Sequence, residues 1–451
     1  MKINQIKQKI YKSLKIILSN ESWLAFTLIG ITFIFRLLVA MITFSEDNIN
    51  SWADSKEYLW FAQQFAKGNF NPHWEVENHG LEVAPFIPSL ITIFILLFDS
   101  PLWPFFIYNC IITSILVYVL YALGKHIFNS SVGFLISIWA MFYTDYFRFN
   151  IQLLKEPTVY LFLPLTILLM VLSVKNRERI LYVVMSSVTF SILIHTDVRF
   201  LFFTPLFLML FIIVKNTSLI NRMKSILIWF VLCALFASPM IIRNYKVYGE
   251  IVLISPQTIQ ITKKFWKSNL DYYTLSLKDQ VIHKQMLHEA KTLDPAFYEE
   301  KFYKFRFNEA IKDKDGKPPY RYGHYEKYLM AFIHYWQPVY FSSSYLFDGF
   351  RYQKWSIRHN ISSLLFYGIF LPFYILGIVM VIRNKNNFGI FIASIPLAHC
   401  AMHVYVTLAL ERYRSSINFC IVLIALAYLV SQFEKLHKKN NSNFLQNSKK
   451  T

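Results

Sequence analysis

Residues 158–174 read TVYLFLPLTILLMVLSV, an apolar run without a charged side chain. Such a run approaches the ~20 apolar residues that a helix needs to cross the hydrocarbon core of a bilayer. Comparable uncharged runs occur at 104–123, 180–194, 200–214, 226–242, 361–382, 388–410 and 417–432. Apolar residues make up 55% of the 451 residues and charged residues only 16%, a composition poorly suited to a soluble chain. The sequence therefore predicts an all-α integral membrane protein.

Two further spans and one partial span complete the predicted bundle. The span at 22–44 contains Arg36, whose charge is costly at membrane depth and therefore normally faces protein or water. A second span is predicted at 132–148. The segment 83–98 is short and bracketed by prolines, so we expect it to be re-entrant or to lie in the membrane interface. The prediction is a polytopic helical bundle of about ten full spans plus one partial span.

Basic residues orient this bundle. Lysine and arginine gather in both terminal tails and in the turns at 175–179, 215–224 and 383–387. An excess of positive charge in short loops marks the cytoplasmic side, so both termini are expected in the cytoplasm and the opposite span ends outside. The first apolar run is long and lacks a small-residue cleavage site, so no cleavable signal peptide is expected.

The predicted organisation follows from these spans. It consists of a basic cytoplasmic tail at 1–21, a transmembrane core at 22–242 that includes a first outer loop at 45–82, an extracytoplasmic loop region at 243–360, C-terminal transmembrane helices at 361–432 and a basic cytoplasmic tail at 433–451. The formal charge of +19 is spread over the tails and the large outer loop. Nucleic acid is not expected as a partner of a lipid-embedded protein, whereas phosphate and membrane lipids are.

Arginines at the predicted outer span ends suggest a binding site for an anion. They run against the topological bias that keeps arginine on the cytoplasmic side. A guanidinium can pair with phosphate in a bidentate way, although arginine at a span end can also simply reach for the interface. The candidates for phosphate binding are Arg199, Arg243, Arg412 and Arg414, with Asn244 beside Arg243.

Carboxylates accompany these arginines. Asp54 precedes apolar residues at helical spacing, including Tyr58, which predict an amphipathic helix lying on the membrane. Asp54 is a candidate catalytic residue, and the N-cap of that helix is the competing interpretation. Glu156 precedes Pro157 at a helix start, where an acid meets the positive helix end, and is the second candidate carboxylate, with Asp145 as its rival. Tyr58 and Asp145 are also candidates for substrate contact.

A divalent metal cation is the one cofactor that the sequence suggests. The polar loop around His73 to Glu82 contains suitable ligand types, and His195 lies at another outer span end. The spacing matches no compact zinc motif, and a polar surface loop explains the same residues. The competing interpretation of His195 is a buried or interfacial histidine that binds no metal.

Several of these strings together resemble a known family. They are Asp54 with EYLWFAQQFAKG (57–68), APFIP (84–88), Glu156-Pro157, HTDVRFLFFTPL (195–206), SPMIIRNYKVYGEIVLIS (238–255) and ERYRSSINF (411–419). In this order and placement the chain is similar to bacterial membrane glycosyltransferases of the GT-C superfamily, nearest to the protein O-mannosyltransferase and aminoarabinose transferase group. It departs from the pattern at Ser55, where many relatives carry a second acid, and at Asp197, where a basic or small residue is more common.

The resemblance implies transfer of a sugar from a polyprenyl-phosphate donor to a lipid, glycan or protein acceptor on the extracytoplasmic face. On this view Asp54 takes the acceptor proton, and cations hold the departing phosphate. The composition suggests a bacterial inner membrane with the site facing the periplasm or exterior. The alternatives are a transporter or flippase for a lipid-linked or anionic substrate, which would also be polytopic, and a non-catalytic scaffold, which would not explain the outward carboxylates and arginines.

Overall fold

The computed structural model describes residues 21–43, 53–69, 84–98, 101–176, 180–213, 218–248, 251, 332, 335–336, 361–405 and 414–447. Within these residues the regular structure is helical and no strand occurs, as the sequence predicts. The chain forms two compact units. Unit 1 comprises residues 1–255, 372–393 and 419–451, and unit 2 comprises residues 256–371 and 394–418.

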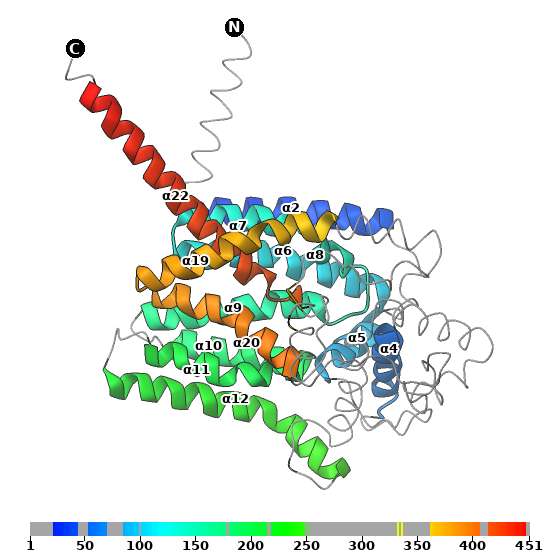
Figure 1. Ribbon diagram of the computed structural model, residues 1–451. Coiled ribbons are helices and arrows are strands. Elements are labelled where there is room, and N and C mark those ends of the chain that lie inside the picture. Colours follow the sequence, from blue (N-terminus) through cyan, green and yellow to red (C-terminus); the bar gives the residue numbers. More distant parts are fainter. Residues whose placement is uncertain are drawn as a thin grey trace, which may run out of the picture. The chain divides into compact units, whose positions relative to one another are not determined.

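The described helices occur in a fixed order along the chain. Their bounds are α2 (Glu21–Thr43), α4 (Ala53–Ala66), α5 (Phe86–Phe98), α6 (Leu102–Ile127), α7 (Ser130–Phe142), α8 (Thr144–Arg148), α9 (Glu156–Lys175), α10 (Ile180–Thr196), η1 (Val198–Phe203), α11 (Thr204–Ile213), α12 (Leu219–Tyr248), η3 (Gly368–Phe370), α19 (Leu371–Arg383), α20 (Asn387–Tyr405) and α22 (Asn418–Asn447). In unit 1 the long helices from α6 to α12 lie side by side with roughly parallel axes, and α4 and α5 lie together at one end of them (Figure 1).

Seven described helices are long and apolar enough to cross a membrane. They are Glu21–Ile42, Leu102–Ile127, Glu156–Lys175, Leu219–Lys246, Ile361–Arg383, Asn387–Val404 and Asn418–Lys438. Four shorter apolar segments, Phe86–Phe98, Ser130–Phe142, Ile180–Thr196 and Val198–Ile213, occupy the places of the other predicted spans. The protein is therefore a multi-pass membrane protein, and the number of full crossings stays a prediction.

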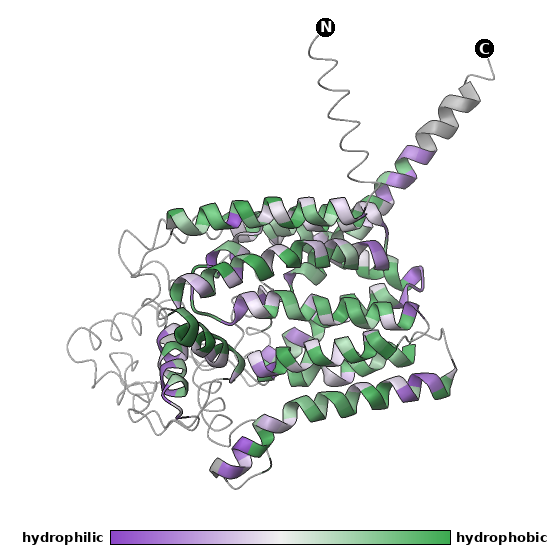
Figure 2. Ribbon diagram, turned by 180° about the vertical axis from the view of Figure 1, so that it is seen from behind, coloured by the Kyte–Doolittle hydropathy of each residue, from purple (hydrophilic) through white to green (hydrophobic). Residues whose placement is uncertain are grey.

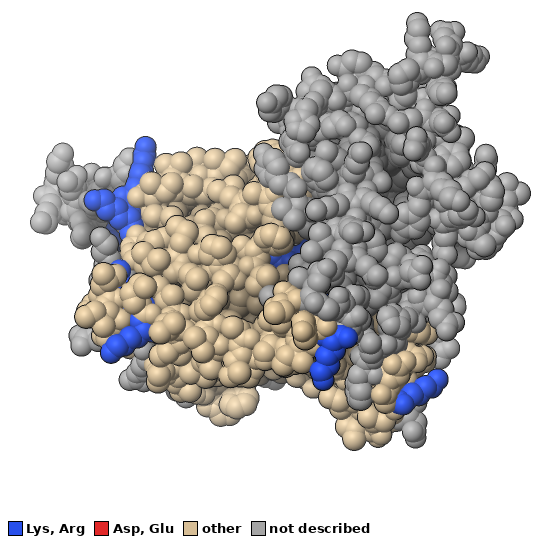
Figure 3. Space-filling model, turned by 90° about the horizontal axis from the view of Figure 1, so that it is seen from below, with Lys and Arg blue, Asp and Glu red and all other residues tan. Residues whose placement is uncertain are grey.

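Helices of unit 1 differ in how much apolar surface they bury. In α9, 83% of the most apolar window is buried, against 28% in α12 and 22% in α2. Figure 2 shows apolar residues along the helix bodies and polar residues towards many of their ends. On the face shown in Figure 3, Lys and Arg side chains lie mostly towards the edges of a broad area in which no acidic residue is visible. Such a surface suits a hydrocarbon environment, with α9 in the core.

Two glycines allow α6 and α7 to approach closely. A Cβ added to Gly133 would lie 2.4 Å from the carbonyl oxygen of Tyr121, and one added to Gly124 would lie 2.7 Å from Cα of Gly133. Real side chains do not tolerate such separations, so the crossing requires glycine. The side chain of Asn129 starts α7 by accepting a 2.9 Å hydrogen bond from the backbone N–H of Val132.

The structure corrects two expectations about local elements. The predicted continuous span at 132–148 is wrong, because the chain becomes extended at Tyr143 and separates α7 from α8. The apolar face of α4 was expected on the membrane surface, but Phe61 and Ala62 are buried within the protein, where Thr92 of α5 donates a 3.1 Å hydrogen bond to the carbonyl of Ala62. The predicted helical spacing itself is confirmed.

Candidate functional site

A buried arginine fixes the break between α7 and α8. The guanidinium of Arg36 donates hydrogen bonds to the carbonyl oxygens of Tyr146 at 2.9 Å and Ala140 at 3.0 Å. Its Cζ atom also lies 4.8 Å from the centroid of the Phe147 ring. Arg36 is 1% exposed, so the prediction that it faces protein or water is confirmed. These bonds satisfy carbonyls that the end of α7 and the short α8 leave without helical partners.

Two candidate carboxylates lie on neighbouring elements. Asp145 is buried in α8 and accepts a 2.6 Å hydrogen bond from the hydroxyl of Tyr143. Glu156 is the first residue of α9 and is also buried. The next residue of α8, Tyr146, packs its ring 4.6 Å from that of Tyr160 in the second turn of α9. The structure thus brings α8 against the beginning of α9.

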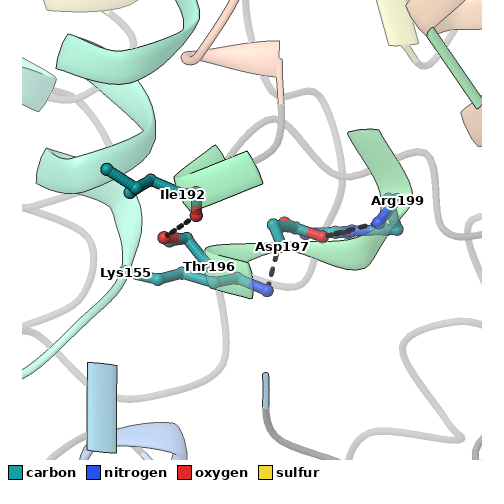
Figure 4. A network of polar contacts seen from close by, with 5 residues as sticks. All are labelled: Lys155, Ile192, Thr196, Asp197 and Arg199. Atoms are coloured by element: carbon teal, nitrogen blue, oxygen red, sulfur yellow. Dashed lines mark hydrogen bonds and ion pairs between the residues drawn. The ribbon is translucent and has the colours of Figure 1, made fainter. Parts of the chain in front are cut away.

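The end of α10 is joined to the beginning of α9 by charged side chains. Lys155 precedes α9, and its Nζ lies 3.1 Å from Oδ2 of Asp197. Arg199 donates two hydrogen bonds to the same carboxylate. Its Nε lies 2.8 Å from Oδ1, and its Nη2 donates to Oδ2. Figure 4 shows Asp197 between the two cations. The side chain of Asp197 also accepts a hydrogen bond from the backbone N–H of Arg199, which makes Asp197 the N-cap of η1.

The electrostatics of this cluster favour an ionised Asp197. Burial by itself would raise the pKa of Asp197, but Arg199 and Lys155 outweigh burial and hold the pKa below its ordinary value. Lys155 and Arg199 both contact the carboxylate of Asp197. The side chains of Lys155 and Arg199 remain 19% and 18% exposed, whereas that of Asp197 is 6% exposed. Both cations are therefore partly accessible to solvent, whereas the carboxylate is buried.

Four other sequence candidates lie in unit 1. Tyr58 is in α4, His195 is in α10, and Arg243 and Asn244 are in α12. Arg243 is half-buried in α12 and donates a 3.3 Å hydrogen bond to Oδ1 of Asn244, which is buried. The Nδ1 atom of His195 lies 2.7 Å from the carbonyl of Ser191, one turn earlier in α10. Tyr58 is buried in α4.

Arg414 belongs to unit 2 and is buried among aromatic residues. Its Cζ lies 3.8 Å from the centroid of the Tyr367 ring, and its Nη1 donates a hydrogen bond to the carbonyl of Tyr335. The hydroxyl of Tyr335 in turn lies 2.6 Å from Nδ1 of His399. These contacts give Arg414 a structural role in unit 2. Binding of phosphate by Arg414 stays a prediction.

Three candidates lie outside the described residues, in whole or in part. Asp54 falls in the first turn of α4, but its side chain is not described. Glu82 and Arg412 lie outside the described ranges altogether. Among the residues that are described, no group of three or more His, Cys, Asp or Glu is placed to share a metal ion. The proposed roles of Glu82 and His195 as metal ligands stay predictions.

Lys155 is the residue that sequence reasoning missed. It stands at a predicted outer span end, directly before Glu156 and Pro157, and so breaks the same topological bias as the arginines. That anomaly could have identified it. Lys155 precedes α9 and Asp197 follows α10, and no pattern in the sequence indicates that these two residues pair.

Comparison with known proteins places these residues in a family segment. Residues 82–242 match the model of the dolichyl-phosphate-mannose-protein mannosyltransferase family. This segment contains Asp145, Lys155, Glu156, Asp197 and Arg199. A comparison with curated protein sequences gave no match.

Solved structures of an archaeal enzyme share the fold. The oligosaccharyltransferase of Archaeoglobus fulgidus tethered with an acceptor peptide containing the NVT sequon gives a TM-score of 0.56 at 10% identity, covering 92% of this chain and 50% of that one. The enzyme in complex with an inhibitory peptide and a dolichol-phosphate gives 0.55 at 12% identity, covering 94% and 52%. The apo form gives 0.54 at 13% identity, covering 93% and 52%. This chain spans about half the length of those proteins, with which it shares its fold.

Proposed function

We propose that this chain, whose residues 82–242 match the dolichyl-phosphate-mannose-protein mannosyltransferase family and whose fold is GT-C, is a membrane glycosyltransferase. It would move a sugar from a polyprenyl-phosphate-linked donor to an acceptor hydroxyl or amine. One observation carries the proposal: the family segment places two buried carboxylates and the paired cations Lys155 and Arg199 around the beginning of α9. A transferase with a phosphate leaving group needs both kinds of residue.

The chemistry assigns different tasks to the two kinds of residue. A carboxylate takes the proton of the attacking acceptor, and Asp54 in the first turn of α4 is the proposed base. Glu156 is the proposed second carboxylate, with Asp145 as its rival. Because a phosphate leaves as a stable anion, no acid is needed on that side, and cations such as Arg199 and Arg243 are proposed to stabilise it.

Packing supports the use of α4 in the same site. The hydrogen bond from Thr92 to Ala62 joins α4 to α5, and Phe86 at the start of α5 packs 6.5 Å from Phe162 of α9. The helix that carries Asp54 is therefore connected through α5 to the helix that carries Glu156. This arrangement supports a site that draws on both helices.

The proposed setting is the extracytoplasmic face of a bacterial inner membrane. Basic turns occur between α9 and α10 and between α19 and α20, which supports a cytoplasmic location for that side of unit 1. The proposed donor carries a hexose or a pentose. Similar structures are described with a dolichol-phosphate and an inhibitory peptide and with a tethered acceptor peptide, which supports a lipid-linked donor and a protein or glycan acceptor. A lipid acceptor fits the same site, and a divalent cation is a proposed cofactor.

The decisive experiment measures polyprenyl phosphate released from a panel of polyprenyl-phosphate sugars by the full-length protein in lipid vesicles. Asp54→Asn is expected to reduce release by ~10² or more, since a positioned base contributes 10²–10⁴ in rate. Glu156→Gln and Asp145→Asn compare the two rival carboxylates. Glu21→Gln is the matched control, because Glu21 pairs with Lys125, whose neighbour His126 accepts a hydrogen bond from Lys175 at the other end of α9.

Two results would contradict the proposal. One is donor-dependent release that is equal in wild type, Asp54→Asn and Glu21→Gln. The other is movement of an intact lipid-linked sugar across the vesicle membrane without its cleavage, which would identify a transporter. Folding of each variant is verified by size-exclusion chromatography and thermal unfolding.

A further inference from the structure

Two successive residues of α6 contact the chain on both sides of Glu156. We infer that Tyr108 and Asn109 are positioning residues that fix where Glu156 lies at the beginning of α9. This inference rests on the proposed function, in which Glu156 is the second carboxylate of the site, and it names what holds that carboxylate in place. Tyr108 and Asn109 act through α9 and are assigned no contact with the sugar or the phosphate.

The beginning of α9 has no side-chain cap of its own. Lys155 occupies the N-cap position with helical backbone angles, and in the described part of the chain its side chain makes no hydrogen bond to the first turn of α9. A side-chain cap normally fixes a helix start by satisfying one of its four unpaired backbone N–H groups. Neighbouring elements therefore have to fix where Glu156 lies. The ion pair of Lys155 with Asp197 supplies one contact from the end of α10, and α6 supplies the others.

Asn109 anchors the segment that leads into Glu156. Its Nδ2 donates hydrogen bonds to the carbonyl oxygens of Asn150 at 3.1 Å and Gln152 at 3.3 Å. Because both partners are acceptors, the nitrogen of the Asn109 amide faces this segment. Asn150 is held a second time, since its Nδ2 donates a 3.1 Å hydrogen bond to Oγ1 of Thr113, one turn further along α6. Asn109 is fully buried, so loss of its amide leaves buried carbonyls without a donor.

Tyr108 anchors the first turn of α9 on the other side of Glu156. Its hydroxyl lies 3.2 Å from Oγ1 of Thr158, two residues after Glu156, and the two groups share a hydrogen bond. Thr158 is fully buried, so this bond joins α6 to α9 inside the protein. Because Tyr108 and Asn109 are neighbours in one helix, Glu156 lies between two anchor points that move together.

A carboxylate that takes part in catalysis tolerates little displacement. A misplacement of about 1 Å can reduce a rate by ~10², and working sites hold their groups to within about 0.5 Å through supporting hydrogen bonds. Loss of either anchor is therefore expected to lower turnover at saturating donor and to leave the KM for the donor unchanged. The same loss is expected to have little effect once Glu156 no longer carries a carboxylate.

Three substitutions remove the anchors. Tyr108→Phe and Thr158→Val each remove one hydroxyl of the same hydrogen bond. Phenylalanine keeps the ring contacts of Tyr108 with Phe94 and Phe105, whose centroids lie 6.3 Å and 5.9 Å away. Asn109→Leu removes the amide donor at similar side-chain size. If Asn109→Leu does not fold, the two milder variants decide the test.

The test measures turnover and hydrogen–deuterium exchange of the full-length protein in lipid vesicles, with release of polyprenyl phosphate as the measure of turnover. Each variant is expected to lower turnover by about five- to tenfold at unchanged KM. Each is also expected to accelerate exchange of backbone amides at 150–159 by about tenfold, because local opening becomes easier. In the Glu156→Gln background the same substitutions are expected to change the residual release by less than about twofold, since residues that act as a unit are not additive.

Thr166→Val is the matched control for Thr158→Val. Thr166 lies two turns further along α9 and is also fully buried, and its hydroxyl lies 2.9 Å from that of Thr189 in α10. The same substitution thus removes the same kind of contact between helices, but away from Glu156. Thr166→Val is expected to lower the unfolding temperature without changing turnover or the exchange at 150–159.

Ser114→Ala is the control for Asn109→Leu. Ser114 is fully buried in α6, and its hydroxyl donates a 2.6 Å hydrogen bond to the carbonyl of Cys110 within the same helix. Its removal costs a buried hydrogen bond of α6 without releasing the segment before α9. Wild-type turnover and wild-type exchange at 150–159 are expected for Ser114→Ala.

The outcomes separate this inference from the proposed function. Wild-type turnover in Tyr108→Phe and Thr158→Val, or the full five- to tenfold loss in the Glu156→Gln background, would overturn the positioning role. Release that depends on Asp54 but not on positions 108 and 158 would retain the glycosyltransferase and remove this role. Faster exchange at 150–159 in the variants, with no release from any donor by wild type, would retain the anchor and remove the glycosyltransferase.

Discussion

The hydroxyl of Tyr143 lies 2.6 Å from Oδ2 of Asp145 and donates a hydrogen bond to it, across the break between α7 and α8. Tyr143 is the extended residue at this break. Its backbone and its side chain therefore both help to position Asp145. A buried carboxylate with a hydroxyl donor at this distance is oriented by that donor.

Tyr143→Phe is therefore expected to destabilise the protein by about 1.5–3 kcal/mol, since a buried bond to a charged group is lost. Thermal unfolding in detergent measures the change. Tyr118→Phe is the control, because Tyr118 makes a ring contact with Tyr121 at 6.0 Å that phenylalanine retains. Equal unfolding temperatures for both variants would show that the Tyr143 hydroxyl does not stabilise the break.

Arg36→Leu is expected to cost more, about 3 kcal/mol or above, because it leaves two buried carbonyls without their donor. The control is Arg222→Leu, since Arg222 also donates to a backbone carbonyl, that of Ile212 at 2.9 Å, but at an exposed position. Unfolding by heat is again the measurement. A smaller loss for Arg36→Leu than for Arg222→Leu would contradict the role assigned to Arg36.

Gly133→Ala is expected to destabilise the α6–α7 crossing by about 1–3 kcal/mol, as overpacking typically does. The matched variant is Gly30→Ala in α2, where an added Cβ meets nothing within 4 Å. Gly30→Ala is expected to be neutral or stabilising, since alanine favours helix over glycine by about 1 kcal/mol. If the two variants unfold alike, helix propensity and not the close crossing decides the effect.

The Asp197 cluster makes a prediction about pH. The cations hold the pKa of Asp197 below its ordinary value, so the carboxylate contributes stability that is complete above about pH 4 and is lost as pH falls through the lower folded pKa. Asp197→Asn is expected to be less stable than wild type by about 3–5 kcal/mol at neutral pH, because it removes one partner of a buried ion pair. That difference should stay constant from about pH 8 to pH 5 and shrink only below about pH 4. A difference that shrinks between pH 7 and pH 5 would contradict the assignment.

The helical class was predictable because apolar runs carry a local signal, and Arg36 could be placed against protein because its charge excludes lipid. The break at Tyr143 was not predictable, since no proline or glycine interrupts the apolar run there. Individual candidates such as Glu156 and Arg199 could be named from their place at span ends. Their partners could not, because the contact of Lys155 with Asp197 depends on how α9 and α10 pack.

The contact of Arg36 with α8 also bears on how this protein could be recombined with its relatives. The family match begins at residue 82, so Arg36 lies upstream of the segment whose α7–α8 break it holds. A chimera that exchanged only residues 82–242 would separate the break from its arginine. The transplantable module is therefore longer than the segment that matches the family model, and it has to include α2.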